Sequence, residues 1–247
     1  MDSVEVVILL GVILVTLAVS AVALVRTSRD ERAVIAEIDA ARESGDFGSL
    51  VARTGIPWPQ VGETLMAERI DLISVDPARI DAFLSVHDED FVIEHGWTDQ
   101  FQADLVAGTE YFAKRAVCLP GTWLLRIRAD GATPRVDNAG FITVSEQRES
   151  NETRPTLGMQ LRSPYRGVGY MSEALPLVLQ RIAADGCAPV QMTTAAANEA
   201  VVALAQRCGF GEVERVAHRL PNGAVVPSIV YEWPAPDEQG ATNPAER

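Results

Sequence analysis

A run of twenty uncharged, mostly apolar residues near the N-terminus sets the first limit on how this chain can fold; it reads VVILLGVILVTLAVSAVALV at residues 6–25. As an α-helix it extends about 30 Å, the thickness of a bilayer's hydrocarbon core. The run predicts a transmembrane helix, preceded by a short external tail at residues 1–5. A cleaved signal peptide is the alternative, since Ala21-Val22-Ala23 fits a cleavage site. Against it, the residues before the run include two acids and no Lys or Arg.

Three arginines follow the apolar run: Arg26, Arg29 and Arg32. Basic residues next to a span remain preferentially in the cytoplasm. The predicted topology is therefore single-pass in the cell membrane, with the N-terminus outside and the rest of the chain cytoplasmic. The lipid bilayer is then one partner of the chain, through residues 6–25.

Charge and residue usage narrow the function classes. The chain has 34 Asp and Glu against 21 Lys and Arg, a formal net charge of -13. A nucleic-acid partner is disfavoured, because phosphate contacts need a basic face, and a cationic partner such as an amine is favoured. The three cysteines and three histidines show no metal-ligand spacing, so no metal site is predicted. The sequence carries no signal for the oligomeric state.

Between the apolar run and the main domain we expect a linker at residues 26–64. Helix formers at residues 30–43 are followed by glycines, and the sequence Ile-Pro-Trp-Pro at residues 56–59 interrupts regular structure. The linker is expected to be a semi-rigid stalk, or to lay its apolar side on the domain. The polar segment at residues 235–247 is predicted to be a disordered tail.

The remaining domain, residues 65–234, alternates short strands with amphipathic helices. The Asn-Gly pair at residues 222–223 predicts a hairpin. The order of elements indicates an α/β fold with a mixed sheet and a strand–helix–strand unit near its middle. Strands are predicted at 70–74, 123–128, 140–145, 156–161, 190–194, 214–220 and 225–233, and helices at 77–86, 101–116, 171–182 and 199–208.

Two glycines, Gly167 and Gly169, separate the strand predicted at 156–161 from the helix that follows. Such a loop lets backbone N–H groups approach an anion, and the helix N-terminus adds partial positive charge. The loop predicts a phosphate or pyrophosphate site. Its spacing is not that of a dinucleotide fold, since position 172 is Ser172, nor does it have the Gly-Lys-Ser/Thr ending of a P-loop.

The segment LGMQLRSPYRGVGYMSEAL at residues 157–175 resembles the acetyl-CoA signature of the GNAT N-acetyltransferases. The segment NEAVVALAQRCGF at residues 198–210 resembles the one that follows it in that family. The branch most similar is that of ribosomal-protein N-terminal acetyltransferases, with a looser likeness over residues 66–233. The resemblance implies a splayed, mostly antiparallel sheet flanked by helices, which binds acetyl-CoA as cosubstrate between two parting strands.

The resemblance also implies roles for particular residues. Strand backbone would contact the pantetheine arm, loop N–H groups the pyrophosphate, and an Asn the reactive end of the cofactor. Trp97 is the candidate for lining the acceptor pocket, with a place in the core as the alternative. The implied cofactor-binding residues are Met159, Leu161, Arg166, Gly167, Val168, Gly169, Tyr170, Met171 and Asn198.

Three positions depart from the family pattern. Pro164 stands where Gln or Arg is usual, Val201 where this branch often has Ser, and Ala205 where other members place a Tyr general acid. The strand at residues 156–161 holds no Glu or His to act as a base, so no catalytic residue is assigned.

The function expected is that of a membrane-anchored N-acetyltransferase, in which a protein N-terminus or a small amine attacks acetyl-CoA directly. The alternatives are a catalytically weak acetyl-CoA-binding sensor at the membrane, or a scaffold that keeps the fold for contacts alone.

Overall fold

The computed structural model describes residues 58–114, 118–149 and 152–233. The predicted external tail, transmembrane helix and C-terminal tail lie outside these residues, as does most of the predicted linker. Within the described ranges, no helix has both the length and the apolar character needed to span a bilayer.

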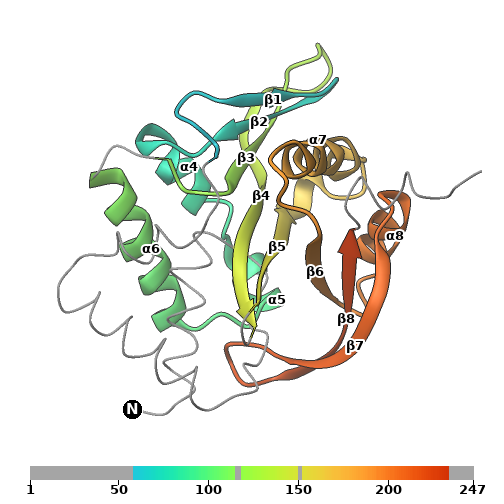
Figure 1. Ribbon diagram of the computed structural model, residues 1–247. Helices are drawn as coiled ribbons and strands as arrows, with labels where there is room; N and C mark the ends of the chain where they lie inside the picture. Colours follow the sequence, from blue (N-terminus) through green and yellow to red (C-terminus); the bar gives the residue numbers. More distant parts are fainter. Residues whose placement is uncertain (1–57, 115–117, 150–151, 234–247) are drawn as a thin grey trace, which may run out of the picture.

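In the part of the chain that the structure describes, eight strands form one mixed sheet in the order β1-β2-β3-β4-β5-β6-β8-β7 (Figure 1). Every neighbouring pair is antiparallel except β5 and β6, which are parallel and are joined through a helix. The mixed α/β sheet predicted from the sequence is therefore confirmed. The strands are β1 (Thr64–Met66), β2 (Ile70–Ser74), β3 (Thr122–Ile127), β4 (Val136–Glu149), β5 (Glu152–Leu161), β6 (Val190–Ala195), β7 (Gly211–Arg219) and β8 (Val225–Trp233).

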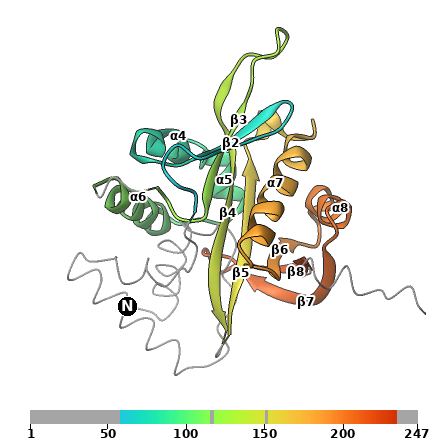
Figure 2. The same cartoon turned by 45° about the horizontal axis from the view of Figure 1, so that its top comes forward.

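Helices cover both faces of the sheet, with α4 and α6 on one side and α7 and α8 on the other (Figures 1 and 2). Two short 3-10 turns, η1 (Pro77–Arg79) and η2 (Ser163–Tyr165), lead into the helical segments. The helices are α4 (Ile80–Leu84), α5 (Glu89–Glu94), α6 (Asp99–Lys114), α7 (Tyr170–Ala184) and α8 (Glu199–Arg207).

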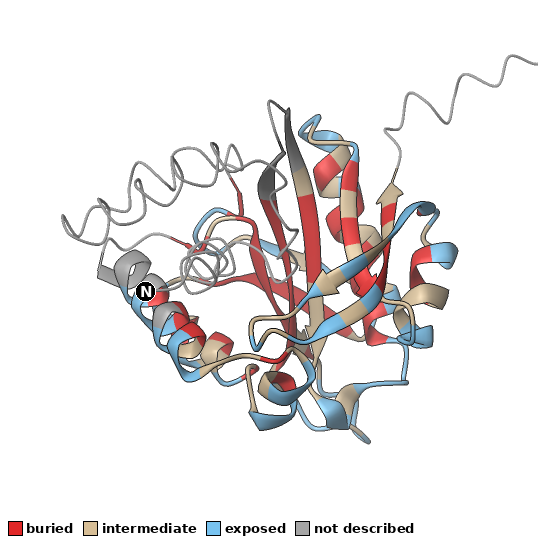
Figure 3. Ribbon diagram, turned by 90° about the horizontal axis from the view of Figure 1, so that it is seen from below, coloured by how far each residue is buried: buried red, intermediate tan, exposed pale blue. Residues whose placement is uncertain are grey.

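The buried side chains form two clusters, one on each face, with the central strands between them (Figure 3). Alternate residues of a strand point to opposite faces. On β4, for example, Phe141 packs with the residues of α4, α5 and α6, whereas Ile142 packs with those of α7 and α8. The α4 side and the α7 side of the sheet are thus separate packing environments.

Helix α7 carries the apolar face that its spacing predicts. Intervals of three and four residues place its apolar side chains on one stripe. All six residues of that stripe are buried: Met171, Ala174, Leu175, Val178, Leu179 and Ile182.

The domain begins earlier than residue 65. Trp58, placed in the predicted linker, is 1% exposed, and its carbonyl accepts a hydrogen bond from the Gly121 N–H at 2.7 Å. The expected boundary is therefore too late, and residues 58–64 belong to the domain. Pro59, directly after the tryptophan, does not prevent the indole from entering the core.

Helix α5 is the one helix of the described residues that the sequence analysis missed. It spans six residues, too few for an amphipathic repeat to stand out. Its local signal is the Asp88 side chain, which accepts a hydrogen bond from the Phe91 N–H at 3.1 Å and caps the helix. Buried Phe91 fixes α5 to the α4 side of the sheet.

Candidate functional site

Strands β5 and β6 share one register pair, Thr156 opposite Gln191, although β5 pairs with β4 as far as Leu161 (Figure 1). From Gly158 to Leu161, no register pair joins β5 to β6 within the described residues. Parting parallel strands match the implied geometry for acetyl-CoA.

Strand geometry decides which backbone groups face that edge. The Arg162 N–H donates to the Ala139 carbonyl of the β4 side at 2.9 Å. Because backbone groups alternate in direction along an antiparallel ladder, those of Met159 and Leu161 point away from β4, toward β6. The structure thus directs the backbone of both predicted residues into the space between the two strands.

The glycine loop follows directly. Gly167 and Gly169 have φ of 78° and 89°, a left-handed conformation that glycine adopts without steric cost. Among the hydrogen bonds of the described residues, none uses the N–H of Gly167, Val168 or Gly169 as donor. All three residues are exposed, and α7 begins immediately after them. Unpaired donors beside the positive end of a helix are the arrangement with which proteins commonly bind anions.

The other predicted cofactor residues are arranged around this loop in different ways. The Tyr170 and Met171 side chains are buried in the core, so these residues present only backbone to an anion. Asn198 follows the end of β6 and caps α8, because its side chain accepts a hydrogen bond from the Val201 N–H at 3.3 Å. The structure shows the capping role of Asn198; its contact with a cofactor remains a prediction.

The Arg166 side chain does not extend into the loop's row of donors. Its Nη1 and Nη2 bond to Oε1 and Oε2 of Glu94 at 2.6 and 2.8 Å, and its Nε donates to the Leu161 carbonyl at 2.8 Å. The hydrogen bonds from Arg166 hold the pKa of the Glu94 carboxyl below its usual value, against a smaller opposing effect of burial. The sequence analysis missed Glu94, because it lies on the unpredicted α5.

Trp97 lies in an aromatic cluster on the α4 side of the sheet. Its ring stacks on His87 at 5.2 Å between centroids and meets Phe101 at 4.4 Å. Trp97 is half-buried and packs against the cluster of buried side chains on this face, which supports the core alternative. His87 is enclosed by aromatic rings, and burial lowers its pKa to about 4, so this imidazole is neutral at pH 7.

The loop before Trp97 lies against the hairpin between β7 and β8. A Cβ added to Gly96 would lie 2.6 Å from the Asn222 side-chain amide nitrogen. Two segments far apart in sequence therefore meet on the α4 side. The predicted Asn-Gly hairpin is confirmed, with β7 and β8 antiparallel and Gly223 at a φ of 88°.

The departures from the family pattern leave two positions of α8 without a hydroxyl. Val201 packs against the apolar cluster, and Ala205 is fully buried. Pro164 is exposed within η2. No catalytic acid or base is assigned at these positions. Within the described residues, no group of three or more His, Cys, Asp and Glu side chains is placed to hold a metal ion.

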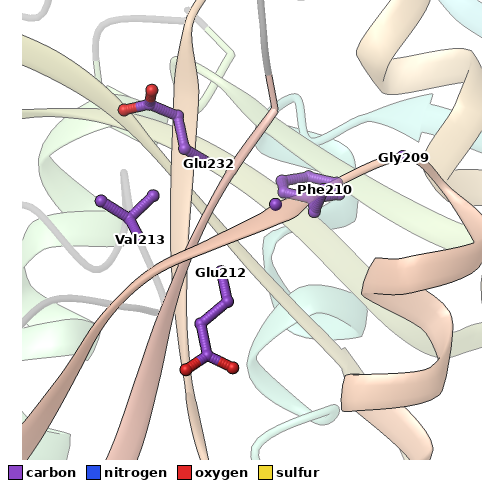
Figure 4. Close-up of a pocket in the computed structure, with 6 residues that line it drawn as sticks. Gly209, Phe210, Glu212, Val213 and Glu232 are labelled. Atoms are coloured by element: carbon purple, nitrogen blue, oxygen red, sulfur yellow. The ribbon is translucent and has the colours of Figure 1, made fainter.

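A surface cavity of about 400 Å³ lies elsewhere, at the start of β7 (Figure 4). Its two carboxylates, Glu212 and Glu232, point away from each other, and Glu232 accepts a hydrogen bond from Gln191 at 2.8 Å. It contains none of the predicted cofactor residues. Its lining is Gly209, Phe210, Gly211, Glu212, Val213 and Glu232.

Comparison with solved structures shows the same fold in known acetyltransferases. A GNAT-family acetyltransferase from Bacillus anthracis aligns with a TM-score of 0.52 and 15% identity, over 70% of this chain and 98% of that one. RimL, a ribosomal L7/L12 alpha-N-protein acetyltransferase in complex with coenzyme A, aligns with a TM-score of 0.51 and 16% identity, over 70% and 98%. Ribosomal-protein-S5-alanine acetyltransferase from Vibrio fischeri aligns with a TM-score of 0.51 and 13% identity, over 71% of this chain and 98% of that one.

No curated protein matches the sequence significantly. The model of the acetyltransferase (GNAT) domain family matches residues 69–211, which include β2, the parting strands and the glycine loop. This match covers more than half of the chain. The chain therefore belongs to the GNAT acetyltransferase family.

Proposed function

We propose that this protein transfers the acetyl group of acetyl-CoA to an amine, with the cosubstrate held between β5 and β6. One observation carries the proposal: β5 and β6, joined by the single register pair Thr156–Gln191, part toward a loop in which the N–H groups of residues 167–169 donate no hydrogen bond within the described chain. Both features lie within the region that matches the family.

Backbone groups do most of the binding in this proposal. The backbone groups of Met159 and Leu161 face the pantetheine arm. The amides of that arm have N–H donors and carbonyl acceptors, so they can pair with β5 as the backbone of a neighbouring strand does. The N–H groups from Arg166 to Met171 surround the pyrophosphate, with the positive end of α7 behind them. Asn198, at the end of β6, contacts the cosubstrate near its reactive end.

The chemistry is direct transfer. Bound acetyl-CoA supplies a thioester, whose carbonyl carbon a neutral amine attacks; the new C–N bond replaces the C–S bond, the amine loses a proton and the thiolate takes one. Positioning the amine and polarising the carbonyl through backbone N–H groups lower the barrier. An N-terminal amine, with a pKa near 8, needs less help from a base than a lysine near 10.4. A site without an assigned base therefore favours a peptide or protein N-terminus.

Two neighbouring structures support this acceptor class by analogy. RimL is an alpha-N-protein acetyltransferase, and the NatC complex, which aligns with a TM-score of 0.50 and 16% identity, is bound to a peptide and CoA. The net charge of -13 also favours a cationic acceptor.

Turnover on a panel of acceptors tests the proposal. The full chain in detergent is incubated with acetyl-CoA and peptides that carry a free N-terminus, a lysine with a blocked N-terminus, or neither, and thiol release is followed. We expect faster thiol release with the peptide that carries a free N-terminus than with either of the two other peptides. Tight binding of acetyl-CoA without turnover on any amine favours the sensor, which the absence of hydroxyls at Val201 and Ala205 supports.

We also propose that residues 6–25 anchor the enzyme in the cell membrane, with the domain in the cytoplasm. Support comes from the uncharged run and from the arginines that follow it. After alkaline extraction, the full chain is expected to remain with the membranes, and a Leu10→Arg, Leu14→Arg variant to be released. A mature chain whose mass lacks the apolar run would instead establish a cleaved signal peptide.

A further inference from the structure

Helix α5 is attached to the cofactor loop by polar contacts along its length. The loop segment contributes an arginine, a serine and a second arginine, and the α5 segment contributes three acids, in matching order. The contacts join segments more than seventy positions apart. They are Arg162 Nε to Asp88 Oδ2 at 3.3 Å, Ser163 Oγ to Asp90 Oδ2 at 2.8 Å, and the paired bonds of Arg166 to Glu94 at 2.6 and 2.8 Å.

The Arg166–Glu94 contact is the most defined of the three. It is bidentate, which fixes the plane of the guanidinium as well as its distance. The third nitrogen, Nε, donates to the Leu161 carbonyl at the end of β5. The side chain thus joins three places: the last residue of the strand, the loop and α5.

These contacts occupy the guanidinium of Arg166, which would otherwise be available to bind an anion. Its charge is balanced by the Glu94 carboxylate, and all three of its side-chain nitrogens donate within the protein. The N–H groups of the next three residues make no hydrogen bond within the described chain. The loop therefore offers backbone donors to a phosphate, while the arginine side chain is turned to structural contacts.

We propose that Glu94 is a positioning residue for the cofactor loop. By holding Arg166 across the Leu161 carbonyl, it fixes the loop conformation in which the backbone donors converge. The affinity for CoA then depends on a carboxylate that does not touch the cofactor and that lies on the α4 side of the sheet. This inference rests on the proposed binding of acetyl-CoA at the loop; it does not depend on the acceptor.

A direct-contact role for Arg166 makes the opposite prediction for Glu94. If the arginine bound phosphate itself, neutralising Glu94 would free its charge, and CoA would bind as tightly as before or more tightly. If the pair acts as a support, loss of either partner removes the same support. The signs for Glu94→Gln therefore differ between the two roles.

The test is a double-mutant cycle on CoA affinity. Titration calorimetry of CoA into the full chain is carried out for Glu94→Gln, Arg166→Met, the double variant and the unaltered protein. We expect each single variant to bind CoA about fivefold more weakly, the upper end of what one partly exposed charge pair contributes, and the double variant to be no weaker than either.

Glu212→Gln is the matched control, because Glu212 also accepts two hydrogen bonds from one arginine: Nε and Nη2 of Arg215 donate at 2.7 and 2.9 Å, away from the loop. Its CoA affinity should equal that of the unaltered chain. The melting temperature of each variant is also measured without ligand. A purely structural role of the pair would lower the melting temperature and leave the dissociation constant for CoA unchanged, whereas a positioning role weakens CoA binding.

Several outcomes would overturn the inference. Glu94→Gln with unchanged or tighter binding assigns Arg166 to the phosphate, and fold-losses that multiply in the double variant show independent roles. If the unaltered chain does not bind CoA, the proposed function fails, and the inference fails with it. If the unaltered chain binds and all variants bind equally, the inference alone fails.

Discussion

The α7 side and the α5 side of the parting strands present their functional groups in different ways. On the α7 side, one continuous stretch from Met159 to Met171 supplies backbone donors and acceptors. On the α5 side, side chains such as those of Glu94 and Trp97 come from separate segments, and Glu94 meets its partner Arg166 across 72 positions. A backbone site is visible in local sequence, whereas a side-chain site becomes visible only in the fold.

Gly140 lies where β4 and β5 approach closely, in the part of the sheet that separates the α7 side from the α5 side. It pairs with Leu161 across β4 and β5, and an added Cβ would lie 2.1 Å from the Gln160 carbonyl oxygen. Gly140→Ala must push the two strands apart, so we expect a loss of at least about 3 kcal/mol in the free energy of unfolding. Urea denaturation measures it.

Gly131→Ala is the control for this change, because Gly131 has a φ of 85° and an added Cβ there meets nothing within 4 Å. It should cost about 1 kcal/mol, from the left-handed backbone alone. Equal losses in the two variants would show that close approach of β4 and β5 does not determine stability.

His87, on the α5 side, should make the free energy of unfolding depend on pH. Burial lowers the pKa of His87 to about 4, from 6.5 for an exposed imidazole. As the pH falls below 6.5, the unfolded chain takes up this proton before the folded chain does, and stability is lost. The share due to His87 between pH 7 and pH 4 is about 2 to 3 kcal/mol.

Denaturation across that pH range, with and without His87→Phe, measures this share. Phenylalanine keeps an aromatic ring next to Trp97 and removes the titrating group. The variant should lose less stability on acidification than the unaltered chain. Parallel curves would mean that His87 is not the group responsible.

On the α7 and α8 side of the sheet, two substitutions of Asn198 distinguish its role as a helix cap from a contact with the cofactor. Asn198→Ala should cost about 1 kcal/mol of unfolding free energy, because α8 loses its cap, whereas Asn198→Ser should keep most of the stability. The serine variant lacks the amide, so we expect it to bind acetyl-CoA about fivefold more weakly if the proposed contact is made. Unchanged affinity in a stable Asn198→Ser protein would limit Asn198 to capping.

Much of the fold could be predicted because its signals are local. The apolar stripe of α7 and the Asn-Gly hairpin each occupy a short stretch of sequence, and both are confirmed. The two loop glycines lie between β5 and α7, where their place in the sequence predicts them. At the start of α6, the hydroxyl of Thr98 accepts a hydrogen bond from the Phe101 N–H at 3.2 Å, which is likewise a local capping contact.

What could not be predicted depends on distant partners. Trp58 enters the core next to Gly121, and α5 is secured by Phe91 and by its contacts with the loop before α7. Neither leaves a periodic pattern in its own segment. Glu94 was missed for the same reason, since nothing in the sequence around it indicates that Arg166 is its partner.

The central claim is that the loop at residues 166–171 binds the pyrophosphate of acetyl-CoA. Gly167 and Gly186 have left-handed φ values of 78° and 68°, and neither has an atom within 4 Å of an added Cβ. Alanine at either position should therefore cost a similar amount of stability, about 1 kcal/mol, as at Gly131. Calorimetric titration of CoA into both full-chain variants is the most direct test. We expect binding at least about tenfold weaker for Gly167→Ala and unchanged for Gly186→Ala. Equal affinity in the two variants would contradict the claim.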